Sequence, residues 1–300
     1  MKALLEKSCT SCTKSSIRTY YYNIKALAKI AGYQEPPKHS RWINKTLLAK
    51  IRKFPLGKFK NMTIAGIKAL GAYGTKNEEW AKAMTKATER YNTERNKQKR
   101  TPREAKNWPD GGYKALSKLA DELYGEVQDL FKKAPAAVTL SELWKMARWF
   151  IVLFYSKHAL RGDLGDLHSS KKGQNYIEKK KGRWHAHVGQ HKTVKAHGAI
   201  ELELNAEVSK ALDKYLPYVR AKTTHGFLIS TKRGGKKMTR KDMMELLRNT
   251  TEARIGKRIG VQLVRVLKTT QHFKSIDESA KLRGELAHGP QMQWKYVSRT

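Results

Sequence analysis

One stretch of the sequence constrains the fold more than any other, because it divides the chain in two. Residues 96–112 read NKQKRTPREAKNWPDGG, with two prolines and a pair of glycines among polar and basic side chains. Such a composition interrupts both helices and strands. We therefore predict a linker over residues 97–112, a helical domain over 15–96 before it and a larger domain over 113–300 after it. Residues 1–14 show no helical pattern, and we expect a loose N-terminus.

The first domain has the pattern of a small helical bundle. Ser15 or Ser16 can cap a first helix, in which apolar residues follow at helical spacing: Ile17, Tyr20, Ile24, Leu27 and Ile30. Further helices are predicted over residues 42–51, 62–70 and 78–96, with lysine and arginine on their polar faces. Pro36–Pro37 and Pro55–Gly57 separate them.

The second domain is predicted to be mostly helical around one β insert. Thr139 can cap a long buried helix over residues 140–158. Residues 184–204 predict strands, because AIELEL alternates apolar and polar side chains. The helices resume over 208–219, 241–255, 261–270 and 276–286, and a short strand is expected at 227–230. The fold class is thus mainly α with a small β insert, or α+β.

The charge of the chain points to a polyanionic partner. Lys and Arg number 62 against 26 for Asp and Glu, a net charge of +36. Double-stranded DNA is the first candidate, and two basic domains joined by a flexible linker could close around a duplex. No basic membrane anchor or lipidation motif is visible. The longest apolar run, Trp149–Tyr155, has seven residues, whereas a membrane span needs roughly 20.

Metal and cofactor motifs are not evident in the sequence. Cys9 and Cys12 would make half of a zinc site without a second ligand pair, so we expect two reduced thiols. His185, His187 and His191 would share one face of a strand, but too few further ligands accompany them. We expect neither metal nor cofactor. Reduced cysteines and the lack of a signal peptide lead us to expect an intracellular protein located with DNA.

Four motifs occur in the order that is typical of one enzyme family. They are HALRGDLGDL, which contains Arg161; GQHKTVKAHGAIELEL, which contains Lys192; VQLVRVLKTT, which contains Gln262 and Arg265; and LRGELAHGPQMQWKYV, which contains His288 and Tyr296. Each motif alone is weak, but their collinear order resembles the tyrosine recombinases, or integrases. The resemblance covers residues 15–300 and is nearest to integrases of mobile elements and large DNA viruses.

The resemblance implies both a fold and a chemistry. The N-terminal helical domain would be the core-binding domain of the family, and residues 113–300 the catalytic domain. Tyr296 would attack a DNA phosphate and form a 3′-phosphotyrosyl link. Arg161 and Arg265 would hold the phosphate, and Lys192 would protonate the leaving oxygen. His288 and Gln262 would donate hydrogen bonds to the phosphate. The enzyme would act as a homo-oligomer, a tetramer assembled on DNA in the host nucleus, the cytoplasm or a virion.

Some features depart from the family pattern. Gln262 stands where the family usually has a histidine, and glutamine does not titrate near neutral pH. His272 is a nearby substitute, although on a different turn. His288 and Tyr296 are eight residues apart, one fewer than is usual. Lys195 rivals Lys192 as the acid. The acidic residue after the first arginine is Asp163, one position early.

Other functions remain open at the level of sequence. A type IB topoisomerase or a telomere resolvase would use the same chemistry with a different outcome. The separate helical domain and the lack of an S-K-x-x-x-Y string argue against a topoisomerase. A non-catalytic DNA- or RNA-binding protein is also compatible with Gln262. If the recombinase interpretation is right, Arg161, Arg265 and His288 should converge on one phosphate-sized pocket.

Overall fold

The computed structural model describes residues 1–233, 235–273, 280–287, 289, 292–293 and 295–298. The chain divides into two compact units, residues 1–97 and 98–300. The described part is mostly helical, with one three-stranded antiparallel sheet. The predicted fold class, mainly α with a small β insert, is therefore confirmed.

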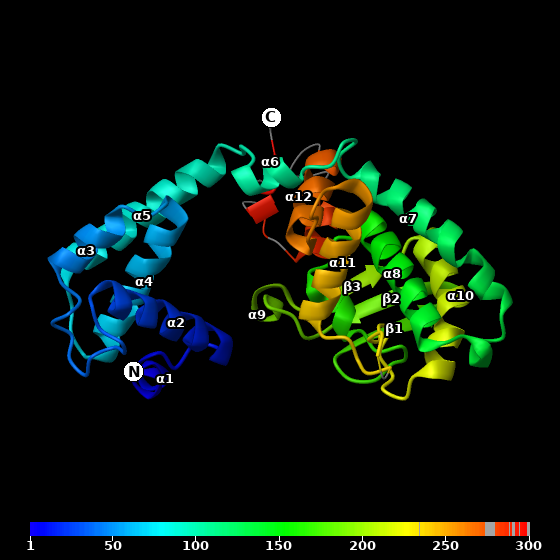
Figure 1. Ribbon diagram of the computed structural model, residues 1–300, viewed down its shortest axis with the longest axis horizontal. Helices are drawn as coiled ribbons and strands as arrows, with labels where there is room; N and C mark the ends of the chain where they lie inside the picture. Colours follow the sequence, from blue (N-terminus) through cyan, green and yellow to red (C-terminus); the bar gives the residue numbers. More distant parts are fainter. Residues whose placement is uncertain (234, 274–279, 288, 290–291, 294, 299–300) are drawn as a thin grey trace. The chain divides into compact units, whose positions relative to one another are not determined.

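The first unit is built from helices only in its described residues (Figure 1). They are α1 Lys2–Ser8, α2 Lys14–Ile30, α3 Lys45–Arg52, α4 Leu56–Ala72 and α5 Glu78–Asn96. Its core centres on Trp80 of α5, which is fully buried and donates a hydrogen bond from Nε1 to the Asn44 carbonyl. Gly66 of α4 faces the Trp80 ring, and a Cβ at this position would overlap that ring. A glycine in mid-helix is thus explained by close packing.

Several helix boundaries in this unit differ from the sequence prediction, and two of them have a clear physical reason. Helix α4 begins at Leu56, directly after Pro55, and not at residue 62. Proline interrupts a helix interior but is tolerated at its beginning, so Pro55 marks a start. Helix α2 is capped by Thr13, whose side chain accepts from the Ser16 amide, and neither Ser15 nor Ser16 is the cap.

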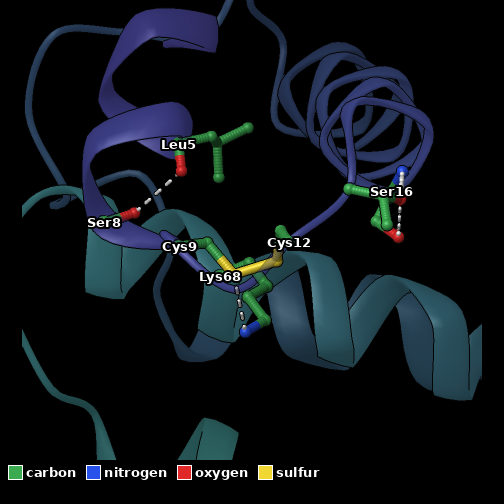
Figure 2. Close-up of a disulfide and its surroundings, with 7 residues drawn as sticks. Leu5, Ser8, Cys9, Cys12, Ser16 and Lys68 are labelled. Atoms are coloured by element: carbon green, nitrogen blue, oxygen red, sulfur yellow. Dashed lines mark hydrogen bonds between the residues drawn. A yellow bond between two sulfur atoms is a disulfide. The ribbon is translucent and has the colours of Figure 1, made fainter. Parts of the chain in front are cut away.

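Residues 1–14, expected to be loose, contain a packed helix. Leu5 of α1 is fully buried in the core of the first unit, and α1 packs against α2 and α4. Cys9 and Cys12, which follow α1, form a disulfide (Figure 2). The prediction of two reduced thiols is therefore wrong. Lys68 of α4 donates to the Cys9 sulfur at 3.7 Å. Because the two cysteines are joined in a disulfide, they do not support the expected intracellular location.

The second unit begins with residues that were expected to form the linker. Its elements are α6 Pro102–Asn107, α7 Lys114–Val127, η1 Gln128–Lys132, η2 Pro135–Ala137, α8 Leu140–Lys157, η3 Gly162–Asp166, β1 Asn175–Lys180, β2 Arg183–Val188, α9 Val194–His197, β3 Ile200–Glu203, α10 Ala206–Lys222, α11 Arg240–Ile255, α12 Val261–His272 and α13 Ala280–Leu286. Helix α6 has a capping box between Thr101 and Glu104. Asn107 accepts from the Arg258 amide at 2.9 Å, so this part of the expected linker is held against the second unit.

Helix α8 forms the centre of the second core, as its apolar sequence predicts. Thr139 and Glu142 make a capping box at its start, and its side chains from Trp149 to Ser156 are all buried. Helices α7 and α10 pack against it. Among the described residues, no helix is long and apolar enough to cross a membrane.

The sheet has the strand order β1-β2-β3, and each neighbouring pair is antiparallel. In β3, Ile200 and Leu202 are buried, whereas Glu201 and Glu203 are exposed, which confirms the predicted alternation. The loop between β2 and β3 spans residues 189–199 and contains α9, so the predicted strand region of 184–204 is interrupted by a short helix. Strand β1 was not predicted. Its sequence, NYIEKK, is mostly polar, and its pairing with β2 holds it in place.

Candidate active site

Arg161 follows the buried helix α8 and begins the turn η3. The chain leaves α8 at His158 in extended conformation, and the Arg161 carbonyl accepts from the Tyr155 hydroxyl at 2.8 Å. The Arg161 side chain is half-buried, and its Nη1 donates to Thr193 Oγ1 at 3.3 Å. Arg161 therefore contacts the loop between β2 and β3 at Thr193, the residue that follows Lys192.

This loop is held by a buried histidine. His191 is 6% exposed, and its Nε2 donates to the Gly198 carbonyl at 2.8 Å across the loop. The other ring nitrogen, Nδ1, accepts from the Thr193 amide at 3.4 Å. Lys192 and Lys195 are both exposed. Neither lysine forms a hydrogen bond or an ion pair with another side chain in the part of the chain that the structure describes, so the geometry does not choose between them.

Arg265 is the most buried charged side chain of the candidate site, with 1% exposure. It lies on α12, and its Nη2 donates to the Leu286 carbonyl at 2.7 Å. Burial lowers the pKa of Arg265, the nearby Tyr296 opposes this effect, and the positive charge of Arg161 adds to it. The two guanidinium groups thus lie in one electrostatic neighbourhood. Two positive charges that act on each other in this way favour the binding of an anion such as a phosphate.

Tyr296 is half-buried beside α12. Its ring centroid lies 5.6 Å from the Arg265 guanidinium carbon. Its hydroxyl donates to Gln262 Oε1 at 3.5 Å, a long contact. Gln262 and Arg265 are three residues apart on one helix and therefore share a face. Thr270 of the same helix also holds the tyrosine segment, because its Oγ1 accepts from the Ser298 amide at 2.9 Å.

The structure therefore brings three of the six predicted site residues into direct contact, because Tyr296 meets both Gln262 and Arg265 of α12. Arg161 comes from a separate segment and is linked to them through the effect of its charge on Arg265. Lys192 lies in the loop that contacts Arg161, but its side chain forms no hydrogen bond or ion pair among the described residues. His288 lies outside the described residues, so its predicted position is not tested.

His272 does not take the place of the missing histidine at Gln262. Its ring meets the edge of the Tyr113 ring, with centroids 5.9 Å apart. Burial lowers the pKa of His272, and the charge of Lys268 adds to this. Lys268 in turn donates to both carboxylate oxygens of Glu285, at 2.8 and 2.6 Å. His272 thus belongs to a different polar cluster.

Two of the three histidines that the sequence places in this region, His187 and His191, make local contacts. His187 pairs with Glu201 and stacks on Tyr176, with ring centroids 4.7 Å apart. His191 lies in the loop described above. Within the described residues, no group of three or more His, Cys, Asp or Glu side chains is arranged to hold a metal ion.

Sequence reasoning missed Arg240, the first residue of α11. Its Nη1 lies 2.9 Å from Asp163 Oδ1, and it also forms an ion pair with Asp166. In a chain with 62 lysines and arginines, a single arginine in KKMTRKD gives no signal in the sequence. Only the acidic residues in RGDLGD, which need a cationic partner when they are buried, indicate that such a residue exists.

Comparison with solved structures finds distant similarity in shape. No protein-family model matches the chain, and no curated protein is significantly similar to it. Among solved structures, the chain is similar to the crystal structure of XerA recombinase, with 12% sequence identity and a TM-score of 0.42. The alignment covers 100% of this chain and 93% of that one. A similarity this distant decides neither the fold nor the function of the chain.

Proposed function

We propose that the chain breaks and rejoins double-stranded DNA through a covalent phosphotyrosyl intermediate, as a site-specific recombinase does. The supporting observation is the neighbourhood of Tyr296, Arg265, Gln262 and Arg161, whose segments lie far apart in the sequence. A hydroxyl nucleophile beside one guanidinium group, which in turn feels the charge of a second, suits attack on a phosphodiester. The net charge of +36 suits a DNA partner.

The proposed reaction has one bond formed and one broken. The Tyr296 oxygen attacks the scissile phosphorus, loses its proton and forms a 3′-phosphotyrosyl ester. The bond between phosphorus and the 5′-oxygen breaks, and that oxygen takes a proton from Lys192. Arg161 and Arg265 stabilise the charge on the two non-bridging oxygens. The ester keeps the energy of the phosphodiester, so a 5′-hydroxyl can reverse the step without a cofactor.

Gln262 has a limited part in this scheme. Its amide oxygen accepts a hydrogen bond from the Tyr296 hydroxyl and orients it. An amide is not basic enough to take the proton, which must leave to water or to another group. His288 is proposed, from its place in the motif, to donate a hydrogen bond to the phosphate. Assembly as a tetramer on DNA remains part of the proposal.

A covalent-adduct assay tests the nucleophile. The duplex carries a nick that traps the cleaved product, and the adduct is detected by denaturing gel electrophoresis. Tyr296→Phe keeps the ring and removes the attacking oxygen, so DNA affinity should stay near that of wild type while the adduct disappears. Tyr176→Phe, at a half-buried tyrosine of β1, is the control and should form the adduct normally. An adduct on the Tyr296→Phe protein would refute the assignment.

The two arginines should affect the rate and not only the affinity. Arg161→Ala and Arg265→Ala should each lower the rate of adduct formation by about 10²–10³ fold, the usual effect of removing one such donor. Thermal unfolding must be measured in parallel, because Arg265 also holds the Leu286 carbonyl.

A wild-type chain that binds DNA tightly and forms no adduct would instead be a non-catalytic binding protein. Recombination between two supplied sites distinguishes a recombinase from a topoisomerase.

The general acid is tested with a modified substrate. A bridging 5′-phosphorothiolate has a sulfur leaving group that needs less protonation than oxygen. Lys192→Ala should therefore lose cleavage of the ordinary duplex and regain it on the phosphorothiolate. Lys195→Ala is the matched control from the same loop. Rescue of Lys195→Ala in place of Lys192→Ala would assign the acid to residue 195.

A further inference from the structure

Arg240 connects the segment that carries Arg161 with the loop that carries Lys192. Its guanidinium contacts Asp163 at 2.9 Å and Asp166, both in η3. Its Nη2 also donates to the Gln190 carbonyl at 3.3 Å, at the start of the loop between β2 and β3. One side chain thus contacts three acceptors in two segments, an arrangement that suits the planar fork of arginine.

Asp163 is the buried carboxylate at the η3 end of this connection, and it requires a positive partner. The residue is 1% exposed, and burial raises the pKa of its carboxyl group. The charge of Arg240 opposes that rise most strongly, and the charge of Arg161 also opposes it. A buried carboxylate that lost its cation would be strongly destabilised. The position of η3, and with it of Arg161, therefore depends on Arg240.

Backbone packing places Arg240 directly against η3. A Cβ added to Gly165 would lie 3.3 Å from the Arg240 Cα, closer than ordinary packing allows. A Cβ on Gly162 would lie 3.2 Å from the Met244 sulfur. The two glycines of RGDLGD thus let the first turn of α11 approach the turn that follows Arg161.

Gln190, at the loop end of this connection, is also held by hydrogen bonds. The Gln190 amide donates to Asn175 Oδ1 at 2.7 Å, and Asn175 Nδ2 donates back to the Gln190 carbonyl at 3.0 Å. Arg240 donates to the same carbonyl. Lys192 follows two residues later, and Thr193 contacts Arg161. Three contacts, Arg161 with Thr193, Gln190 with Arg240 and Arg240 with Asp163, thus form a closed ring together with the backbone that joins these residues.

We propose that Arg240 is a positioning residue that fixes the 189–199 loop, and with it the general acid, relative to Arg161. The inference rests on the proposed function for its catalytic consequence. Arg240 would not touch the reacting atoms. The competing role is direct contact with a DNA phosphate, since its side chain is 37% exposed.

The catalytic test compares two substrates. Arg240→Met keeps the apolar stem and removes the charge and the fork. It should cleave the ordinary nicked duplex at least tenfold more slowly than wild type, with a clearly smaller loss on the 5′-phosphorothiolate. Arg240→Lys should recover little, because one ammonium cannot reach all three acceptors. Arg254 lies on the same helix as Arg240 and forms an ion pair with Glu126 of α7. Arg254→Ala is the control and should cleave both substrates normally.

Two results would overturn the inference. An equal loss on both substrates would mean that Arg240 does not act through the acid. A loss of affinity with a salt dependence shallower by about one phosphate contact would mean that it binds DNA directly.

Hydrogen exchange supplies a measurement that does not depend on catalysis. In Arg240→Met, or in Arg240→Lys if the first variant does not fold, the amides of residues 189–199 should exchange faster, while those of α8 keep their protection. Unchanged exchange in the loop would refute the positioning role. If the wild type forms no adduct, the proposed function fails, yet this measurement still decides whether Arg240 holds the loop.

Discussion

At the residue scale, the proposed reaction makes Gln262 the residue that faces the Tyr296 proton as it leaves. Its amide accepts from the hydroxyl at 3.5 Å but does not titrate. Gln262→His would place an imidazole there. Above its ordinary pKa of about 6.5 the ring is neutral and can accept the phenolic proton; below that value it is charged and cannot. The rate of adduct formation should therefore gain a rise with pH near about 6.5 that wild type lacks, as single-turnover rates from pH 5 to 9 will show.

The control for this residue is Gln262→Leu, because the leucine side chain is similar in size to glutamine and has no hydrogen-bond acceptor. It should slow the reaction without adding a step to the pH profile. If the Gln262→His and wild-type profiles are parallel, the residue does not contact the reacting hydroxyl, and the arrangement of Tyr296 on α12 must be revised.

At the element scale, the packing of α11 on η3 positions the Arg161 segment. Gly165 faces the backbone of Arg240 and Gly162 faces the flexible side chain of Met244. Backbone cannot move aside, whereas a methionine can change rotamer. Gly165→Ala should thus lower the free energy of unfolding by about 1–3 kcal/mol, as overpacking does, and Gly162→Ala by less. Urea unfolding followed by tryptophan fluorescence measures both.

This pair of variants serves as its own control, because the same methyl group is added three residues apart in one turn. Equal destabilisation by the two substitutions would contradict the packing argument. It would indicate that the conformation of η3 itself, and not its contact with α11, requires the glycines.

At the scale of the whole molecule, each unit has its own hydrophobic core. The core of residues 1–97 centres on Trp80, and that of residues 98–300 on α8, with no residue in common. Residues 98–300 alone should therefore fold. If both units bind one duplex, the logarithm of the affinity should fall with the logarithm of the salt concentration by about 0.9 per phosphate contact, and more steeply for the full chain.

Fluorescence anisotropy with one labelled duplex between 50 and 300 mM salt would compare the two proteins. The difference in slope counts the phosphates that residues 1–97 contact. Equal slopes would mean that the first unit binds elsewhere, and the proposal that both domains bind the same DNA would be abandoned.

Local sequence patterns determined most of the elements of this protein. The apolar run in α8, the Thr139 cap and the alternation in β3 each express an interaction within a few residues, so they can be predicted without the fold. The order of Arg161, Arg265 and Tyr296 along the chain could also be recognised as a motif. Strand β1 and helix α1 could not, since the pairing of one and the burial of the other come from partners distant in sequence.

Only the tertiary structure decided which charged residues work together. Many lysines and arginines are equivalent in the sequence, and they become different when the fold buries Arg265 at 1% exposure and places Arg240 against Asp163. The cost of burying a charge depends on its neighbours, and these come from elements far apart along the chain. The sequence therefore determined where helices, strands and candidate residues lie, whereas long-range packing determined which of those residues form one site.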